Sequence, residues 1–350
     1  MKKTSCVITI GGQNVSSAVL PRLISLSVTD KAGVSSDTVS IEIDDTDGVV
    51  LLPQEGVEIT VDLGDEEGVY RVFDGTLDEV RSKGSRSGGM TISVSGKGFD
   101  TKGKAKEPKQ KHWDDKSLKD VFGEAAEAAG LSVVVDSSLG EIKRPYWAQQ
   151  TESFIHFGER IARENGATFK VVGKRAILAK RNGGSSAAGQ ALPAVSAVNG
   201  VNLLSWDIAP VLGRPRFRKV RTRHYNRKTA TWQTEDVEVE DEDTEAEWIR
   251  RNSAGDADEA KAASNSAKDD IEREKGGGSI SIDGTAMPQP EGTIVLSGSR
   301  PGIDGIYRIE TVTQTFDRNS GWTTRLDVKQ PQGDAGTDSR QPTSDAGSPA

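Results

Sequence analysis

Cysteine is nearly absent from this sequence, which has Cys6 as its only thiol among 350 residues. A single cysteine excludes an intramolecular disulfide and a zinc site built from cysteine thiolates. No apolar run approaches the roughly 18 residues that a transmembrane helix needs. Residues 1–3 resemble the start of a signal peptide, but neither a long apolar run nor a small-residue cleavage pattern follows them. We therefore expect a protein that is made and folded in the reducing cytoplasm.

Signatures of catalysis and metal binding are also missing. The sequence has no Gly-x-Ser-x-Gly elbow, no His-Glu-x-x-His helix and no phosphate-binding loop. His112, His156 and His224 are far apart and lack metal-ligand spacing. Residues 44–48 resemble half of a calcium loop, but the apolar and proline residues 51–53 follow, so an acidic turn is expected. The sequence predicts no catalytic residue, no cofactor, no metal and no enzyme activity.

An excess of positive charge is lacking as well. The net charge is -8 and the pI is near 5.2, which argues against a general nucleic-acid binder and suits a soluble particle with a repulsive surface. Apolar residues make up 34% of the chain, and glycine occurs 38 times. Such a composition favours about two to three domains with small cores and many turns.

Alternation of apolar and polar residues dominates the first hundred positions. It covers residues 24–29, 39–44, 57–63 and 90–95. A period of two places one set of side chains in a core and the other in water. Turn residues separate these runs, as at the Asp-Gly pairs 47–48 and 74–75. We predict a tube-like β-barrel domain over residues 1–105.

The period changes after a lysine-rich linker at 101–111. Two helices are predicted, one with an N-cap at Ser117 and a stop at Gly130, the other ending at Gly166. Their apolar faces carry Leu118, Val121, Phe122 and Ala125, and Phe154, Phe157, Ile161 and Ala162. A short strand at 131–135 and a closing hairpin at 167–179 complete a small α+β module, which we place at 106–182.

A flexible linker at 183–194 and a second tube-like β-barrel domain at 195–330 follow. A polar helix at 256–275 interrupts this domain and has only a narrow apolar stripe. The tail at 331–350 is rich in Gly, Asp, Ser, Pro and Thr and is predicted to be disordered. The expected fold class is therefore mainly β with an α+β insertion: two tube-type β-barrel domains plus a small helix-containing module.

Basic residues gather at 214–228, with Phe217 and Tyr225 among them. Three interpretations compete. They are a nucleic-acid surface, a basic strand paired with the acidic run 235–247, and arginines that contact a partner subunit. The negative net charge favours paired strands. The candidate subunit or partner contacts are Arg216, Arg218, Arg221 and Arg223.

Several segments in order resemble the phage late control D family, the baseplate hub proteins of contractile tails. They are residues 23–48 (LISLSVTDKAGVSSDTVSIEIDDTDG), 112–118 (HWDDKSL), 150–153 (QTES) with 159–167 (ERIARENGA), 188–193 (AGQALP), 297–305 and 320–326 (SGWTTRL). Each segment alone is weakly specific, but their order and spacing along nearly the whole chain are specific. The hub part of type VI secretion spike proteins is related to this family.

The resemblance implies a structural protein of the virion tail baseplate, assembled in the host bacterial cytoplasm. It implies a homotrimer whose paired barrels form a pseudo-sixfold ring, a symmetry adapter between the hexameric tail tube and the trimeric central spike. Further implied partners are baseplate wedge components and a tape measure protein, with nucleic acid only passing through the channel. The polar helix at 256–275 is expected on the outside, against a wedge component or the flank of the barrel.

Two related functions and one unrelated function stay open at the level of sequence. The particle can be a tailocin or another contractile injection particle instead of a phage. The hub can also degrade cell wall, with Glu124, Glu127, Glu159 or Glu164 as its acid, but these glutamates fall on polar helix faces where no apolar pocket raises their pKa. A nucleic-acid-binding module centred on 214–228 is the third alternative.

Overall fold

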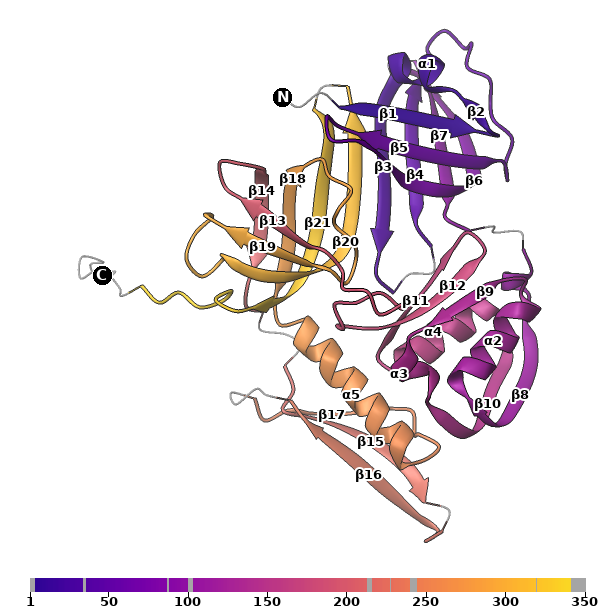
Figure 1. Cartoon of the computed structure of the whole chain (residues 1–350), viewed down its shortest axis with the longest axis vertical. Coiled ribbons are helices and arrows are strands. Elements are labelled where there is room, and N and C mark those ends of the chain that lie inside the picture. The colour runs from indigo at the N-terminus through magenta and orange to yellow at the C-terminus, as the bar shows by residue number, and fades with distance from the viewer. Residues whose placement is uncertain are drawn as a thin grey trace.

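One curved sheet of thirteen strands forms the upper half of the molecule, with the α+β module and a small helix-and-sheet insertion below it (Figure 1). The computed structural model describes residues 4–33, 36–86, 88–99, 103–212, 216–226, 228–239, 244–318 and 320–340. The fold is mainly β with few helices, as the alternation predicts.

The first β unit occupies one end of this sheet. Its strands are β1 (Ser5–Ile10), β2 (Gln13–Asn14), β3 (Leu23–Lys31), β4 (Thr38–Asp44), β5 (Glu58–Gly64), β6 (Val69–Ser85) and β7 (Gly89–Lys97), with the short helices α1 (Ser16–Val19) and η1 (Leu20–Arg22). The strand order is β3-β4-β7-β6-β5-β1-β2. Alternate side chains, such as Ile41, Ile59 and Val61, form a core of their own.

The second β unit occupies the other end. Its strands are β13 (Ala194–Val198), β14 (Leu203–Ala209), β18 (Gly277–Asp283), β19 (Thr293–Ser297), β20 (Gly305–Asp317) and β21 (Gly321–Gln332). A separate core contains Ile280, Tyr307 and Leu326. The long strand β20 pairs with β3 from Thr311 to Phe316, which fuses the two units into one sheet.

The α+β module has the two predicted helices, α2 (Leu118–Ala128) and α4 (Phe154–Glu164). Ser117 and Ser153 cap them, and Gly130 and Gly166 follow with positive φ, as the sequence indicates. The remaining elements are η2 (Lys104–Lys106), β8 (Lys109–Ser117), β9 (Ser132–Val135), α3 (Ser137–Gly140), β10 (Lys143–Glu152), β11 (Ala167–Val172) and β12 (Arg175–Lys180). Strand β8 begins inside the predicted linker 101–111.

The insertion differs from its predicted form. Residues 195–330 do not all belong to the second β unit, because β15 (Lys219–Asn226), β16 (Thr231–Glu238) and β17 (Glu247–Ile249) form a sheet of their own. Helix α5 (Ala257–Arg273) packs on β15 and β16. The predicted helical insertion at 256–275 is therefore only the last part of a larger one, which lies between β14 and β18. Local alternation cannot tell which sheet a strand joins.

The tail begins later than predicted. Strand β21 continues to Gln332, and residues 333–336 form turns that return to the second β unit. Ala335 packs on the core of that unit, and the backbone N–H of Gly336 donates to the carbonyl of Gly302 at 3.0 Å. Gly333, Asp334 and Gly336, which belong to the composition that suggested disorder, form turns here. Residues 341–350 lie outside the described part of the chain.

Candidate interaction surfaces

The basic strand β15 lies between two strands that carry acids. Arg221 donates from Nε and Nη2 to the Asp236 carboxylate at 2.8 and 2.9 Å, and its Nη1 lies 3.4 Å from Glu247 Oε2. The hydrogen bonds from Arg221, followed by those from Lys219, lower the pKa of Asp236. The paired-strand interpretation of the basic stretch is thus confirmed at Arg221.

The other candidate arginines are distributed differently. Arg223 lies two residues along β15, is exposed, and forms no ion pair with another described residue. Arg218 is exposed just before β15, where its backbone bonds Ala246 and Val239. Arg216 is half-buried at the start of the segment. A role for these arginines in partner contacts stays a prediction.

The outer face of the β15–β16 hairpin ends in two exposed aromatic residues. Tyr225 pairs across the strands with Trp232, and their ring centroids are 5.4 Å apart. Tyr225 is 40% exposed and Trp232 is 63% exposed. The opposite face, with Val220, Thr222 and His224, is buried; Thr222 Oγ1 lies 2.7 Å from Ser264 Oγ of α5. The hairpin therefore presents a polar and aromatic surface to the solvent.

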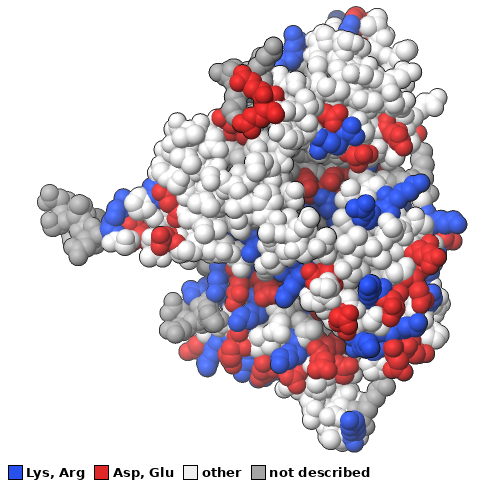
Figure 2. All heavy atoms as spheres, viewed as in Figure 1, with Lys and Arg blue, Asp and Glu red and all other residues white. Residues whose placement is uncertain are grey.

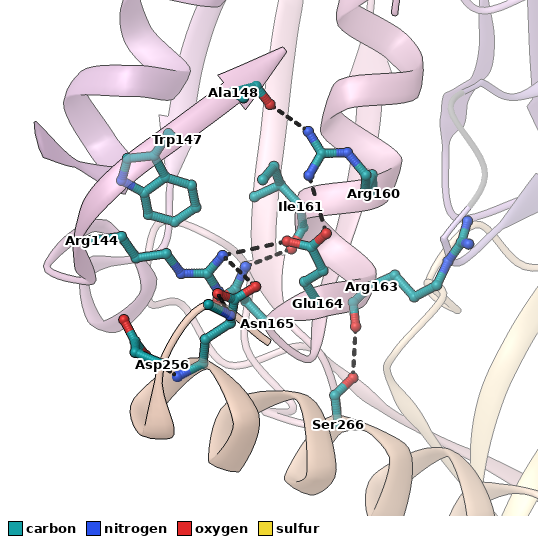
Figure 3. A network of polar contacts seen from close by, with 12 residues as sticks. Arg144, Trp147, Ala148, Arg160, Ile161, Arg163, Glu164, Asn165, Asp256 and Ser266 are labelled. Carbon is teal, nitrogen blue, oxygen red and sulfur yellow. Dashed lines mark hydrogen bonds and ion pairs between the residues drawn. The ribbon is translucent and has the colours of Figure 1, made fainter. Parts of the chain in front are cut away.

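A polar junction fixes the α+β module to the insertion (Figure 3). Arg144 of β10 lies 3.4 Å from Glu164 of α4 and 3.5 Å from Glu259 of α5, and donates to Asn165 at 3.0 Å. The Arg144 guanidinium lies over the Trp147 ring, 4.4 Å from its centroid. Its side chain is only 10% exposed, so paired carboxylates are required to keep it there.

Arg160 extends the same network on α4. Its Nη1 lies 3.1 Å from Glu164 Oε1, and its Nη2 donates to the Ala148 carbonyl at 2.6 Å. Ser266 of α5 donates to the Arg163 carbonyl at 2.9 Å, which adds a second link between the two helices (Figure 3). These bonds connect three elements far apart in the sequence, so periodicity could not reveal them.

The first β unit is joined to the module by a shared lysine. Lys170 Nζ of β11 lies 2.5 Å from Asp30 and 2.6 Å from Asp37. Burial, followed by the charge of Asp30, raises the pKa of Asp37 to about 7 against the opposing effect of Lys170. Burial lowers the pKa of Lys170, but the two aspartates outweigh it and raise the pKa overall.

The glutamates considered for hydrolysis do not form a catalytic pair. Glu124 accepts hydrogen bonds from Lys111 and Trp113, which lower its pKa, the opposite of what a general acid needs. Glu164 is held by two arginines, Glu159 is half-buried on α4, and Glu127 is exposed.

The metal-ligand candidates of the sequence are also dispersed. In the acidic turn at 44–48, Asp47 binds Arg22 at 2.7 and 2.6 Å. His112, His156 and His224 lie on β8, α4 and β15. Among the described residues, no three His, Cys, Asp or Glu side chains are grouped as metal ligands. No helix in that part of the chain is long and apolar enough to cross a membrane.

Apolar side chains are exposed on both β units. Leu51, in the loop between β4 and β5, is 91% exposed, and Val49 and Leu52 beside it are 61% and 58% exposed. On β14, at one end of the sheet, Leu204 and Trp206 are 54% and 39% exposed. Much of the second β unit carries few charges on the face seen in Figure 2, whereas acids and bases alternate over the module and the insertion. A contiguous apolar patch commonly marks a protein contact, whereas single exposed apolar residues are normal.

Comparison with known proteins agrees with this architecture. A probable baseplate hub protein of Escherichia phage 186 is 30% identical over 188 residues, which are 53% of this chain and 48% of the relative. The chain spans about half the length of the curated relatives that it matches.

Solved structures share the fold over most of the chain. The 43 kDa tail protein of prophage MuSo2 from Shewanella oneidensis has a TM-score of 0.71 at 16% identity, over 93% of this chain and 98% of that one. An Escherichia coli component of the type VI secretion system has a TM-score of 0.55 at 10% identity, over 94% and 78% of the two chains. Residues 32–320 match the phage tail baseplate hub (GPD) family. With most of its length in this match, the chain belongs to the phage tail baseplate hub family, whose members are structural components of the virion tail.

Proposed function

We propose that this hub assembles as a homotrimer and joins the hexameric tail tube to the trimeric central spike of a contractile tail. The observation that carries the proposal is the pair of β units fused in one sheet. Three such chains supply the six β units that a hexameric tube requires, while the whole assembly keeps threefold symmetry. The chain then acts as an adapter between two symmetries.

The ends of the sheet support closure of a ring. Among the described residues, β14 pairs with β18 alone and β2 with β1 alone, so the hydrogen-bonded path ends at these strands. Exposed apolar residues lie on the terminal strand β14, Leu204 and Trp206, and in the β4–β5 loop of the first β unit, Leu51. A contact between one end of a chain and the other end of the next is heterologous and closes when three copies complete the rotation.

The β units and the charged parts of the chain are proposed to contact different partners. We propose that the β units contact the tail tube and the spike, and that nucleic acid and the tape measure protein pass through the channel. The charged module and insertion, with Arg216, Arg218 and Arg223, are proposed to contact wedge components of the baseplate. A tailocin or another injection particle requires the same geometry, which the likeness in fold to a type VI component supports.

Analytical ultracentrifugation tests the trimer. The chain alone is expected to sediment with three times the 37.4 kDa mass of one chain, and with the spike protein bound, with that mass plus the mass of the spike. Trp206→Glu places a charge on the β14 surface and is expected to lower the trimer fraction at least about tenfold, because burying an unpaired charge is strongly unfavourable. Trp232→Glu, on the distant hairpin, is the matched control and should leave the mass unchanged. A monomer both alone and with the spike would contradict the proposal.

A further inference from the structure

A groove runs between the α+β module and the hairpin of the insertion. It has a volume of about 860 Å³, within the size range of small-ligand sites. Tyr146, Gln150 and Glu152 of β10 line one wall, and Tyr225, Asn226 and Gln233 line the other. The polar junction of Arg144 and Arg160 also borders the groove.

We propose that this groove binds an oligosaccharide of neutral or amino sugars. Two of the four tyrosines in the chain line it, and both are exposed, Tyr146 by 57% and Tyr225 by 40%. A tyrosine ring offers a flat apolar face to the C–H side of a sugar ring and a hydroxyl to its polar edge. His112 stacks on Tyr146 with a centroid distance of 6.0 Å, and Trp232 contacts Tyr225, so both rings are held in place.

The polar side chains of the groove match a ligand with many hydroxyls. Asn226 Nδ2 donates to Gln233 Oε1 at 3.1 Å, which orients both amides. Amide and carboxylate groups together can both donate to and accept from hydroxyl groups.

The charge of the groove selects against polyanions. Arg144 and Arg160 are paired with Glu152, Glu164 and Glu259. Lys228 and Asp256 also line the groove, so its three bases face four acids and leave no surplus of positive charge. Phosphate-rich or sulfated chains need such a surplus of arginines or lysines. Neutral sugars and amino sugars have no such requirement.

The edge of β10 selects against an extended peptide. A peptide that adds a strand to a sheet needs free backbone groups along the edge. Among the described residues, β10 pairs only with β8, but its other edge is covered by side chains. Arg160 Nη2 occupies the Ala148 carbonyl at 2.6 Å, and Glu152 Oε1 accepts from the Gln150 N–H at 3.4 Å. Recognition in the groove therefore depends on side chains.

Isothermal titration of the full-length protein with two probes tests the proposal. One probe is an oligomer of N-acetylglucosamine, the neutral amino sugar of cell wall, and the other is a neutral O-polysaccharide freed of its phosphorylated core. Saturable binding of either one is expected, and the stronger ligand identifies the source. Tyr225→Ala is expected to weaken that binding about tenfold through loss of ring stacking, whereas Tyr225→Phe keeps it.

Tyr70→Ala is the matched control, because Tyr70 is 41% exposed but lies on the first β unit. It should leave binding unchanged, and equal thermal unfolding of the variants separates loss of binding from loss of fold. Absence of saturable binding to both probes would overturn the proposal, as would equal weakening by Tyr225→Ala and Tyr70→Ala. Capture of a baseplate protein that depends on Tyr225, with neither polysaccharide bound, would assign the groove to a protein and also overturn it.

Discussion

Single side chains connect the separate parts of this hub, and the most unusual of them is Lys170. One ammonium group is shared by Asp30 and Asp37, so the site retains a net negative charge when both aspartates are ionised. The side chains of Lys170 and Asp37 are 19% and 21% exposed, which limits the help that water gives to the second carboxylate. The junction between the first β unit and the module is therefore strained by charge at high pH.

The raised pKa of Asp37 predicts how stability depends on pH. Burial and Asp30 raise this pKa from 3.8 to about 7, so the folded chain holds a proton that the unfolded chain has lost in this window. Stability therefore falls as pH rises from about 4 to 7, with a slope of at most about 1.4 kcal/mol per pH unit from this residue. Asp37→Asn is expected to remove that part of the slope and to stabilise the protein at pH 8.

Urea unfolding at several pH values measures this effect. Asp114→Asn serves as the control, because Asp114 is exposed on β8 and belongs to the module alone. A wild-type slope that persists unchanged in Asp37→Asn would show that the shared lysine neutralises both aspartates.

At the scale of the element, local sequence signals predict the two long helices better than the strands around them. Ser117 and Ser153 start α2 and α4 through their side-chain oxygens, and such caps are local. Strands β8 and β10 are harder to recognise because their sequences are mostly polar. Trp113 and Trp147 are buried in the core of the module, whereas most of their neighbours are exposed. Two buried residues do not produce a readable period.

The charge pattern of the sequence predicts the pairing of the basic strand β15 but not the contacts between distant elements. Its pairing with an acidic strand follows from composition and is present in Arg221 with Asp236. The three-way contact of Arg144 with Glu164 and Glu259 could not be predicted, since it depends on packing between distant elements. Likewise, the groove requires the hairpin to lie beside β10, which no local signal encodes.

Arginines on one strand are expected to have separate roles. Arg221→Ala removes bonds to Asp236 and Glu247 and is expected to lower the unfolding midpoint of the insertion. Arg223→Ala leaves that midpoint unchanged but is expected to weaken a wedge contact by about fivefold or more, as is usual for an interface arginine. Hydrogen exchange of the hairpin measures the first effect, and co-sedimentation with baseplate components measures the second. If Arg221→Ala weakened co-sedimentation and Arg223→Ala destabilised the hairpin instead, Arg221 would be the residue that contacts the partner.

On the scale of the whole molecule, the two β units could be predicted, but their connection could not. Both give readable alternation and form two core clusters, although Trp322 of β21 packs in the core of the first unit. The strand pair that joins them brings Leu26 beside Phe316, which are far apart in the chain. Such long-range pairing is set by the fit of whole surfaces. For the same reason, the sequence placed β15–β17 in the second β unit instead of in the insertion.

The number of buried apolar residues differs between the insertion and the β units, and this difference predicts which strands open first in the folded protein. Among the described residues, the apolar cluster of the insertion contains four buried side chains, Val220, Val239, Ala267 and Ile271, and β16 is exposed along most of its length. Strand β21 lies between β18 and β20 and has buried residues on alternate positions. Regions with few buried apolar contacts open at low free energy. Amide exchange is therefore expected to be fastest in β16 and slowest in β20 and β21.

Helix α5 is expected to be intermediate and uneven along its length. Its C-terminal end is tied to the second β unit by Arg273, whose Nη1 lies 2.8 Å from Glu291 Oε1, with both side chains almost fully buried. Its N-terminal end is held by the cap Asp256 and by the ion pair of the partly exposed Glu259 with Arg144. Hydrogen exchange followed by mass spectrometry should show protection that increases from Ala257 to Arg273. Uniform protection of β16, α5 and β21 would instead mean that the insertion and the β units open as one cooperative unit.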